Sequence, residues 1–424
     1  MNLLFVHQNF PGQFKHLAPA LAKAGHQVKA LGIDGAGLPE IEMIRYRPSR
    51  GSSRNIHPWA ADFETKIIRG EACAAAAARL KAAGFMPDVI VTNPGWGESL
   101  FLKDVWPHAR ILALIEFFYA ARGLDCDFDP EFSTHTLAGD ANVRVKNANM
   151  LMALQTMDHG MCPTAFQRST VPPMFQDRLS VVFDGIDTGV VRADPDATLT
   201  VGGRTLRAGD EVVTFVNRNL EPMRGYHIFM RALPAILRER PNAVVLIIGG
   251  NDVSYGAPPP KGKTWKQIFL DEVKADIDLN RVIFVGRIAY ADYLRVLQVS
   301  ACHVYLTVPF VLGWSCIEAM SAGCVVVASA TPPVQEVIED GKNGILVDFF
   351  DTAALAKSVV DVLAQPAAYQ HLRAAARATA VARYDLASVC LPRQLQLIDQ
   401  LAAGTLNVVA PAAVQGATQF LTRR

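Results

Sequence analysis

The sequence lacks a strong charge of either sign. Its 424 residues include 41 lysines and arginines and 40 aspartates and glutamates, so the formal net charge is +1. A chain this close to neutrality gives no electrostatic argument for binding nucleic acid. The seven cysteines are odd in number and form no C-x-x-C pair. This pattern favours reduced thiols in a cytosolic protein over a disulfide framework or a zinc site.

Long hydrophobic runs are also absent from the sequence. No apolar run reaches the roughly 20 residues that a membrane-spanning helix needs. The first residues, MNLLFVHQNF, have no basic region and are typical of a strand, so we expect no signal peptide. These features predict a cytoplasmic protein and leave open a peripheral contact with the inner face of a membrane.

Several common catalytic motifs are missing as well. None of the ten histidines pairs as H-x-x-x-H or H-E-x-x-H, so we expect no metal site. The sequence contains no G-x-S-x-G, no Walker loop and no G-x-G-x-x-G. The sequence therefore lacks the motifs that hydrolases, kinases and nicotinamide-dependent enzymes usually carry.

The composition is that of a folded protein of two or three domains, with 50% hydrophobic and 19% charged residues. Leu3–Val6 is a continuous apolar run, typical of a parallel strand covered on both faces. A helix is expected over Gln13–Ala24 and a second strand over Gln27–Leu31. Ligands of such sheets bind at the carboxyl ends of strands. Gly12, in the first loop, could therefore let a substrate approach the backbone, although an ordinary turn glycine is the alternative.

A second strand–helix series begins at Val212–Val216 and continues with a helix over Tyr226–Arg238. Two cations, Arg218 and Arg224, lie in the loop between this strand and this helix. Such a pair is chemically suited to a leaving diphosphate. The alternative is a solvated pair on a surface loop, which the preceding buried strand disfavours.

The two series predict an α/β protein of two Rossmann-like domains that face each other across a cleft. Pro195–Asp210 is expected to be the linker, with a small hairpin through its two consecutive glycines. Further helices are expected over Asp140–Met157, Thr352–Ala364 and Leu391–Leu401. The expected parts are residues 1–192, residues 211–385, and a C-terminal helix and tail over residues 386–424.

The most informative stretch of the chain is Val304–Asp351. It predicts a strand over Val304–Thr307, a turn, and a helix over Ser315–Ser321, whose N-terminus would favour an anion such as a phosphate. Glu318 lies on this helix and is a candidate ligand. The alternative is a capping box, in which Glu318 only reaches back to a backbone amide near Ser315.

This stretch resembles the donor-site signature of the retaining glycosyltransferases of family four, which have the two-domain GT-B fold. Gly313, Glu318-Ala319-Met320, Gly323 and Glu339–Val347 fit the family pattern. Phe310 stands where the family has its first glutamate. The loop with Arg218 and Arg224 resembles the family segment whose two cations hold the donor diphosphate.

The first half of the chain resembles one bacterial subgroup of the same family. This resemblance rests on NPGWGESLF and on IEFFYAARGLDCDFDPEF, and the turn at Asp184–Asp187 resembles the one that closes the first domain in the family as a whole. Glu116 occupies the position at which many relatives carry a histidine. The resemblance makes Asn93, Trp96 and Glu116 acceptor-side candidates, with core packing as the alternative for Trp96.

The resemblance implies a retaining transferase with a UDP- or GDP-linked sugar as donor and no obligatory metal. The acceptor would be a hydroxyl of a glycan or lipid-linked molecule, as in bacterial surface polysaccharide or glycoconjugate synthesis. The first domain would be the acceptor side, the second would bind the donor, and the C-terminal helix would return to the first domain. Arg218 and Arg224 would neutralise the diphosphate and Glu318 would bind the ribose. The implied donor-binding residues are Gly12, Gly249, Gly250, Phe310, Gly313, Trp314 and Ser315.

Two other functions stay open at this point. A phosphorylase or nucleotide-sugar epimerase can use the same fold. A non-catalytic nucleotide-sugar binder is the other alternative, because Phe310 replaces a glutamate of the family and Glu116 replaces a histidine of many relatives. The sequence does not identify the sugar, the base, the acceptor or the oligomeric state.

Overall fold

Strand β1 (Asn2–Val6) is buried on both faces and pairs in parallel with a strand on either side. It belongs to a seven-stranded sheet with the order β3-β2-β1-β4-β5-β6-β7. The computed structural model describes residues 1–133 and 135–406. The other strands of this first sheet are β2 (Gln27–Gly32), β3 (Glu42–Arg45), β4 (Val89–Thr92), β5 (Arg110–Leu114), β6 (His159–Cys162) and β7 (Leu179–Val181).

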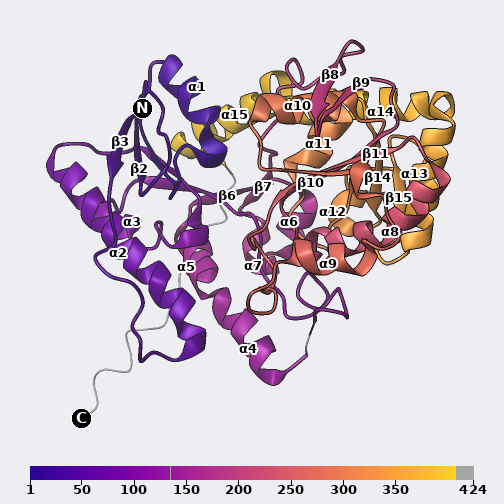
Figure 1. The fold of residues 1–424 in the computed structure, drawn as a ribbon. Helices are drawn as coiled ribbons and strands as arrows, with labels where there is room; N and C mark the ends of the chain where they lie inside the picture. Colours follow the sequence, from indigo (N-terminus) through magenta and orange to yellow (C-terminus); the bar gives the residue numbers. More distant parts are fainter. Residues whose placement is uncertain (134, 407–424) are drawn as a thin grey trace.

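A second parallel sheet of six strands has the order β12-β11-β10-β13-β14-β15. Figure 1 shows the two sheets in two separate halves of the molecule, each covered by helices. The two sheets confirm the prediction of two Rossmann-like domains. The strands of the second sheet are β10 (Val212–Asn219), β11 (Val244–Gly250), β12 (Val282–Gly286), β13 (Cys302–Tyr305), β14 (Val325–Ser329) and β15 (Ile345–Val347).

Helices lie on both faces of each sheet, as parallel sheets require. Those from the first half of the chain are α1 (Leu17–Lys23), α2 (Ala61–Ala82), α3 (Leu102–Val105), α4 (Leu137–Lys146), α5 (Ala148–Thr156), α6 (Ala165–Thr170) and α7 (Pro173–Gln176). Those from the second half are α8 (Tyr226–Glu239), α9 (Trp265–Val273), α10 (Tyr290–Val299), α11 (Trp314–Ser321), α12 (Pro332–Gln335), α13 (Thr352–Ala364), α14 (Gln370–Tyr384) and α15 (Leu391–Ala402).

The segment between the two sheets contains the expected hairpin. Strands β8 (Thr198–Val201) and β9 (Arg204–Arg207) pair antiparallel through two glycines with positive φ, Gly202 and Gly203. A Cβ on Gly202 would lie 2.9 Å from the side chain of Ile283, so the hairpin packs against the edge strand β12.

The chain returns to the first sheet at its C-terminal end. Leu397, Ile398 and Leu401 on α15 belong to the same buried cluster as Leu3 and Phe5 of β1. Figure 1 shows α15 in yellow beside α1, although most of the second half of the chain lies on the other side. The tail expected after this helix lies largely outside the described residues.

Two helices expected from the sequence differ in the structure. The helix predicted over Gln13–Ala24 begins as a 3₁₀ turn at Gly12–Phe14, and the α-helix α1 starts only at Leu17. The segment predicted as one long helix over Asp140–Met157 is helical, but it is divided at Asn147 into α4 and α5. The side chain of Asn147 bonds both backbone groups of Tyr119, at 3.0 Å and 2.6 Å.

Within residues 1–133 and 135–406, no helix combines the length and the apolar composition needed to cross a membrane.

Candidate active site

Polar side chains gather where three neighbouring strands of the first sheet end. Gln13 follows β1, Asn93 follows β4 and Glu116 follows β5. The Gln13 amide donates to one Glu116 carboxylate oxygen and the Asn93 amide to the other, both at 3.0 Å. The order β1-β4-β5 in the sheet brings these residues together. Two of the acceptor-side candidates, Asn93 and Glu116, are therefore direct neighbours.

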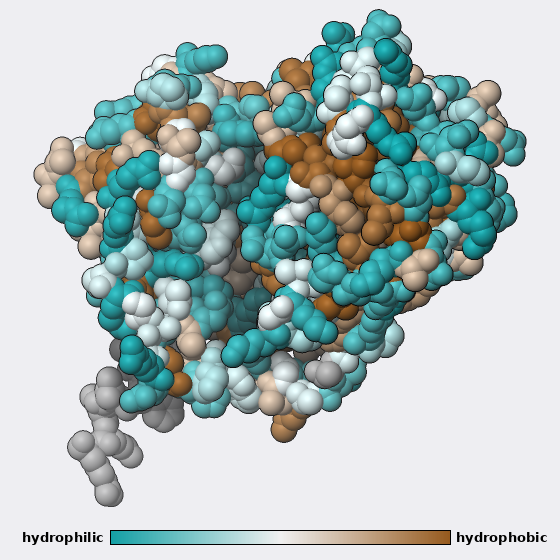
Figure 2. Space-filling model, in the orientation of Figure 1, coloured by the Kyte–Doolittle hydropathy of each residue, from teal (hydrophilic) through white to brown (hydrophobic). Residues whose placement is uncertain are grey.

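The Glu116 carboxylate faces the second domain. Burial raises the pKa of Glu116, and the positive charge of Arg218 acts in the opposite direction. Arg218 is exposed and lies at the carboxyl end of β10. Figure 2 shows the surface hollowed between the two halves of the molecule. The candidate acceptor-side carboxylate and a candidate diphosphate-binding cation thus lie on opposite sides of this cleft.

Gly12 has a different neighbour from the one expected. Its φ is +48°, and a Cβ there would lie 2.4 Å from the ring of His7. The space beside Gly12 is therefore filled by the His7 ring. His7 is buried, and its Nε2 lies 2.8 Å from Gln13 Oε1.

Trp96, the third acceptor-side candidate, packs against this same histidine. The Trp96 ring meets the edge of the His7 ring, with a centroid distance of 5.0 Å. Burial lowers the pKa of His7, while its hydrogen bonds with Gln13 and Asn9 act in the opposite direction. The sequence analysis did not identify His7 as a site residue. The signal that could have identified it is its position, because His7 follows β1 directly and precedes the glycine-containing loop.

Arg224 is buried, unlike Arg218. Its Nη1 donates to Thr307 Oγ1 at 2.8 Å and to the Val311 carbonyl at 2.9 Å. These partners lie in the loop that leads to the N-terminus of α11. The sequence placed both arginines in the loop after the strand, but Arg218 lies within β10 because this strand continues to Asn219. Only Arg224 lies beyond the strand, where it is fixed beside the start of α11.

Phe310 is part of an aromatic cluster that joins the two domains. It is 2% exposed and lies 4.6 Å from Phe117 and 5.0 Å from Tyr255, measured between ring centroids. The Arg224 guanidinium lies 5.4 Å from the centre of the Phe310 ring. The phenylalanine at the position of the family glutamate thus packs across the domain interface.

Glu318 is 5% exposed and is bound by two tyrosines. Tyr290 donates to Oε1 at 2.8 Å and Tyr293 donates to Oε2 at 2.7 Å. Helix α11 starts at Trp314 with Gly313 as its N-cap, and no side chain makes a capping hydrogen bond there. The capping-box alternative is therefore wrong, because Ser315 already lies within the first turn and the Glu318 carboxylate has other partners.

Trp314 contacts the first domain through its indole N–H and through one face of its ring. Its Nε1 donates to Asp184 Oδ2 at 2.7 Å. Burial raises the pKa of Asp184 to about 7. Lys15 of the first domain lies over the Trp314 ring at 4.9 Å and over the Tyr290 ring at 5.7 Å. The start of α11 is therefore enclosed by residues of the first domain.

The glycine pair at the end of β11 packs against protein side chains. A Cβ on Gly250 would lie 2.4 Å from Asn219 Oδ1, and one on Gly249 would lie 2.7 Å from the Leu220 side chain. Arg287 donates to Asn219 Oδ1 at 3.0 Å. Both glycines thus allow the strand tips of the second sheet to approach one another closely.

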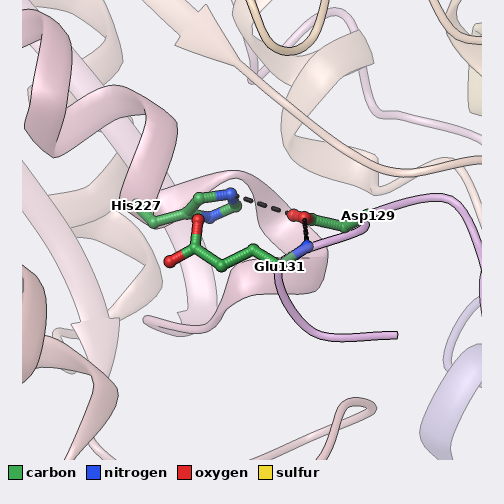
Figure 3. Close-up of side chains that lie close together, drawn as sticks. All are labelled: Asp129, Glu131 and His227. Atoms are coloured by element: carbon green, nitrogen blue, oxygen red, sulfur yellow. Dashed lines mark hydrogen bonds and ion pairs between the residues drawn. The ribbon is translucent and has the colours of Figure 1, made fainter. Parts of the chain in front are cut away.

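A loop of the first domain, Phe117–Phe132, packs on the second domain and is called the interdomain loop below. Asp129 Oδ2 lies 3.0 Å from Nε2 of the buried His227 on α8 (Figure 3). Glu131 lies beside them, so that these three side chains have the spacing of a metal site. However, both Glu131 oxygens accept from Arg231, at 2.7 Å and 2.8 Å. Glu131 and Arg231 therefore form an ion pair between the domains, and the contact of Asp129 with His227 lies beside it.

Comparison with known proteins gives matches over both halves of the chain. The family described as "Glycosyl transferase family 4 group" matches residues 24–191, and "Glycosyl transferases group 1" matches residues 203–379. Glycogen synthase of Mycobacterium tuberculosis is 24% identical over 388 residues, which cover 88% of this chain and 87% of that protein. The GDP-mannose-dependent alpha-(1-6)-phosphatidylinositol monomannoside mannosyltransferase of Mycolicibacterium smegmatis is 29% identical over 186 residues, or 43% of this chain and 46% of that protein.

Solved structures match the whole architecture. Sucrose-phosphate synthase of Thermosynechococcus elongatus has a TM-score of 0.71 at 20% identity, and the match covers 95% of this chain and 100% of that chain. Anabaena HepE in complex with UDP-glucose has a TM-score of 0.61 at 17% identity, with 96% and 99% of the two chains covered. The GT-B fold expected from the sequence is confirmed.

Proposed function

This chain belongs to the family 4 glycosyltransferases, which are retaining enzymes with nucleotide-sugar donors, and we propose that it uses a UDP- or GDP-linked sugar. The acceptor in this proposal is a hydroxyl of a glycan or a lipid-linked molecule. Such a reaction serves the synthesis of bacterial surface polysaccharides or glycoconjugates. Relatives support both nucleotides, since one is named as GDP-mannose-dependent and one was solved with UDP-glucose.

The observation that carries the proposal is the position of Arg224. Two hydrogen bonds to Thr307 and Val311 fix this cation beside the N-terminus of α11, where the helix dipole also favours negative charge. Arg218 adds a second cation, which is exposed near the carboxyl end of β10. Together they would stabilise the charge that develops on the departing diphosphate in the transition state.

On this proposal, Glu318 binds the ribose of the donor. Its carboxylate lies one helical turn inside α11, and an ionised carboxylate accepts hydrogen bonds through two oxygens. Glu116, with Asn93 beside it, lies across the cleft and would accept from a hydroxyl of the acceptor or of the transferred sugar. Trp96 would supply an apolar wall on the same side.

The proposed step breaks the bond between the anomeric carbon and the leaving phosphate oxygen and forms one to the acceptor oxygen on the same face of the sugar. The acceptor's proton passes to the leaving phosphate, as is usually inferred for this family. No protein nucleophile is required, and the roles of the named residues are binding and electrostatic stabilisation.

The test is to incubate the purified protein with UDP-glucose and GDP-mannose, each with and without a panel of glycan and lipid-linked acceptors. We expect release of the nucleoside diphosphate that depends on the acceptor, and a product with the anomeric configuration of the donor by NMR. Conversion of the donor without an acceptor would favour an epimerase, and phosphate-dependent cleavage would favour a phosphorylase. Tight binding without turnover over the whole panel would favour a non-catalytic binder.

A further inference from the structure

Tyr290 and Tyr293 hold the two oxygens of the Glu318 carboxylate separately. Each hydroxyl donates to a different oxygen, at 2.8 Å from Tyr290 and 2.7 Å from Tyr293. With one bond to each oxygen, the plane of the carboxylate is fixed, because rotation about the terminal bond would break both hydrogen bonds.

The two tyrosines come from a neighbouring element and share one face of it. They are the first and fourth residues of α10, which follows the carboxyl end of β12. Residues three apart on a helix lie side by side. Tyr293 is 9% exposed, whereas Tyr290 is 49% exposed. Tyr293 is therefore part of the core, and Tyr290 lies where Lys15 of the first domain approaches the second domain.

The bonds leave acceptor capacity on the carboxylate. Two carboxylate oxygens provide about four lone-pair positions, and the tyrosines use one on each oxygen. One position per oxygen is left for a further donor. Two adjacent hydroxyls, such as those of a ribose, would match this arrangement of one donor per oxygen.

The tyrosines also favour the charged form of Glu318. Burial raises the pKa of Glu318, while the bonds from Tyr293 and Tyr290 and the charge of Lys15 lower it. Hydrogen bonds to a carboxylate stabilise its ionised form. Lys15 belongs to the first domain, so this environment is complete only when both sides of the cleft are in place.

We propose that Tyr290 and Tyr293 are positioning residues, which orient the Glu318 carboxylate so that it accepts hydrogen bonds from both ribose hydroxyls of the donor nucleotide. The inference rests on the ribose role that the proposed function gives to Glu318. A positioning role affects the preference for the ribonucleotide, whereas a purely structural role of the two tyrosines would affect only stability. On this proposal, the hydroxyl groups of Tyr290 and Tyr293 determine how strongly the site prefers a ribonucleotide to a 2′-deoxyribonucleotide.

The experiment is a calorimetric titration of the full-length protein with UDP, GDP, dUDP and dGDP. The comparison includes the unaltered protein, Glu318→Gln, Tyr290→Phe and Tyr293→Phe. Since a hydrogen bond to a charged group contributes about tenfold or more in affinity, the unaltered protein should prefer the ribonucleotide by about that factor. Glu318→Gln should reduce the preference to about twofold or less, because one charged acceptor is lost.

The phenylalanine variants keep the ring packing and remove only the hydroxyl. We expect Tyr293→Phe and Tyr290→Phe each to lower the preference for the ribonucleotide to about threefold, while the affinity for the deoxynucleotide changes little. Tyr369→Phe, a partly buried tyrosine in the second domain away from α10, is the matched control and should keep the full preference. Melting temperatures of the same preparations report any structural effect separately.

The outcomes separate this inference from the proposed function. A preference lost in Glu318→Gln but fully kept in both α10 variants would overturn the positioning role and leave the ribose role of Glu318 intact. A preference unchanged in Glu318→Gln would overturn the ribose role and, with it, the positioning role. A graded loss in the order unaltered protein, tyrosine variants, Glu318→Gln would support both.

Discussion

Arg218 and Arg224 are close in the sequence and carry the same charge, but Arg218 lies in β10 and Arg224 in the turn after it, and the structure separates their expected effects. Arg224 is buried and bonds Thr307 and Val311. Replacing it by alanine would leave buried polar groups without partners, so a stability loss would accompany any loss of activity. Arg218 is exposed and provides the cleaner test of the diphosphate role.

We expect Arg218→Ala to lower kcat by about a hundredfold or more, because losing one transition-state contact typically costs this much. The melting temperature should hardly change, since exposed substitutions usually alter stability by less than about 0.5 kcal/mol. Steady-state kinetics and a thermal melt would measure both. Arg238→Ala, an exposed position at the other end of α8, is the control. Near-normal turnover in Arg218→Ala would remove this residue from the diphosphate site.

Glu98 is a buried carboxylate outside the proposed catalytic chemistry. Glu98 is 0% exposed and lies beside Tyr46 and Cys73, and burial raises the pKa of its carboxyl group. Within the described part of the chain, neither carboxylate oxygen makes a hydrogen bond of normal geometry. The folded state therefore binds this proton more tightly than the unfolded state does. It follows that the free energy of unfolding falls as the pH rises from the ordinary glutamate range through the raised pKa.

We accordingly expect Glu98→Gln to be more stable than the unaltered protein at pH 8. Each unit by which the pKa is raised corresponds to about 1.4 kcal/mol of this difference. The difference should become small near pH 4, where the carboxyl group is protonated in the folded state and largely protonated in the unfolded state. Urea unfolding from pH 4 to 8 would measure it, with the exposed Glu71→Gln as the control. A variant that is equally destabilised at every pH would contradict the explanation.

At the scale of single elements, α15 links the end of the described chain to its beginning. Ile398 is 0% exposed and packs in the cluster that also contains β1 residues. The helix has a polar outer face, on which Gln396 is exposed. Its apolar face therefore completes the cover of the first sheet.

We expect Ile398→Ala to lower the free energy of unfolding by about 2–5 kcal/mol, the usual cost of truncating a buried aliphatic side chain. Gln396→Ala, on the exposed face of the same helix, should stay within about 0.5 kcal/mol of the unaltered protein. Chemical unfolding followed by circular dichroism would measure both. If the two variants behaved alike, the helix would not contribute to the core of the first domain.

At the scale of the whole molecule, the interdomain loop couples the two domains. Phe132 packs against His227 and Trp265, at centroid distances of 5.1 Å and 5.3 Å. Phe128 stacks on Phe350 at 5.2 Å. The Glu131–Arg231 pair is partly exposed, so the aromatic contacts should contribute more to this coupling than the ion pair.

We expect the double variant Phe128→Ala/Phe132→Ala to uncouple the domains. Each domain has its own buried core, so calorimetry should resolve two unfolding transitions where the unaltered protein shows one, and small-angle scattering should give a larger radius of gyration. Leu137→Ala, which is 89% exposed at the start of α4, is the control. A single transition with an unchanged radius would mean that other interdomain contacts are sufficient.

Local sequence patterns predicted most elements because their causes are local. The apolar run Leu3–Val6 lies within β1, and Thr352–Ala364 was predicted with the bounds that α13 has. The division of the expected helix at Asn147 could not be predicted, because it depends on bonds to Tyr119, 28 positions away in the sequence. The loops that follow the strand ends, such as those after β1 and β10, were also located from the sequence, because glycines and the ends of apolar runs mark them.

The sequence by itself determined two parallel sheets, two arginines at and after the end of one strand, and a helix that carries Glu318. Only the tertiary structure decided what these side chains contact. The pairing of Phe310 with Phe117, the bonds of Tyr290 and Tyr293 to Glu318, and the proximity of Arg218 to Glu116 all join residues from different elements. Such contacts depend on strand order and on how the two domains pack. The physical reason is that periodicity and propensity act within a few residues, whereas the site is formed where distant strand ends meet.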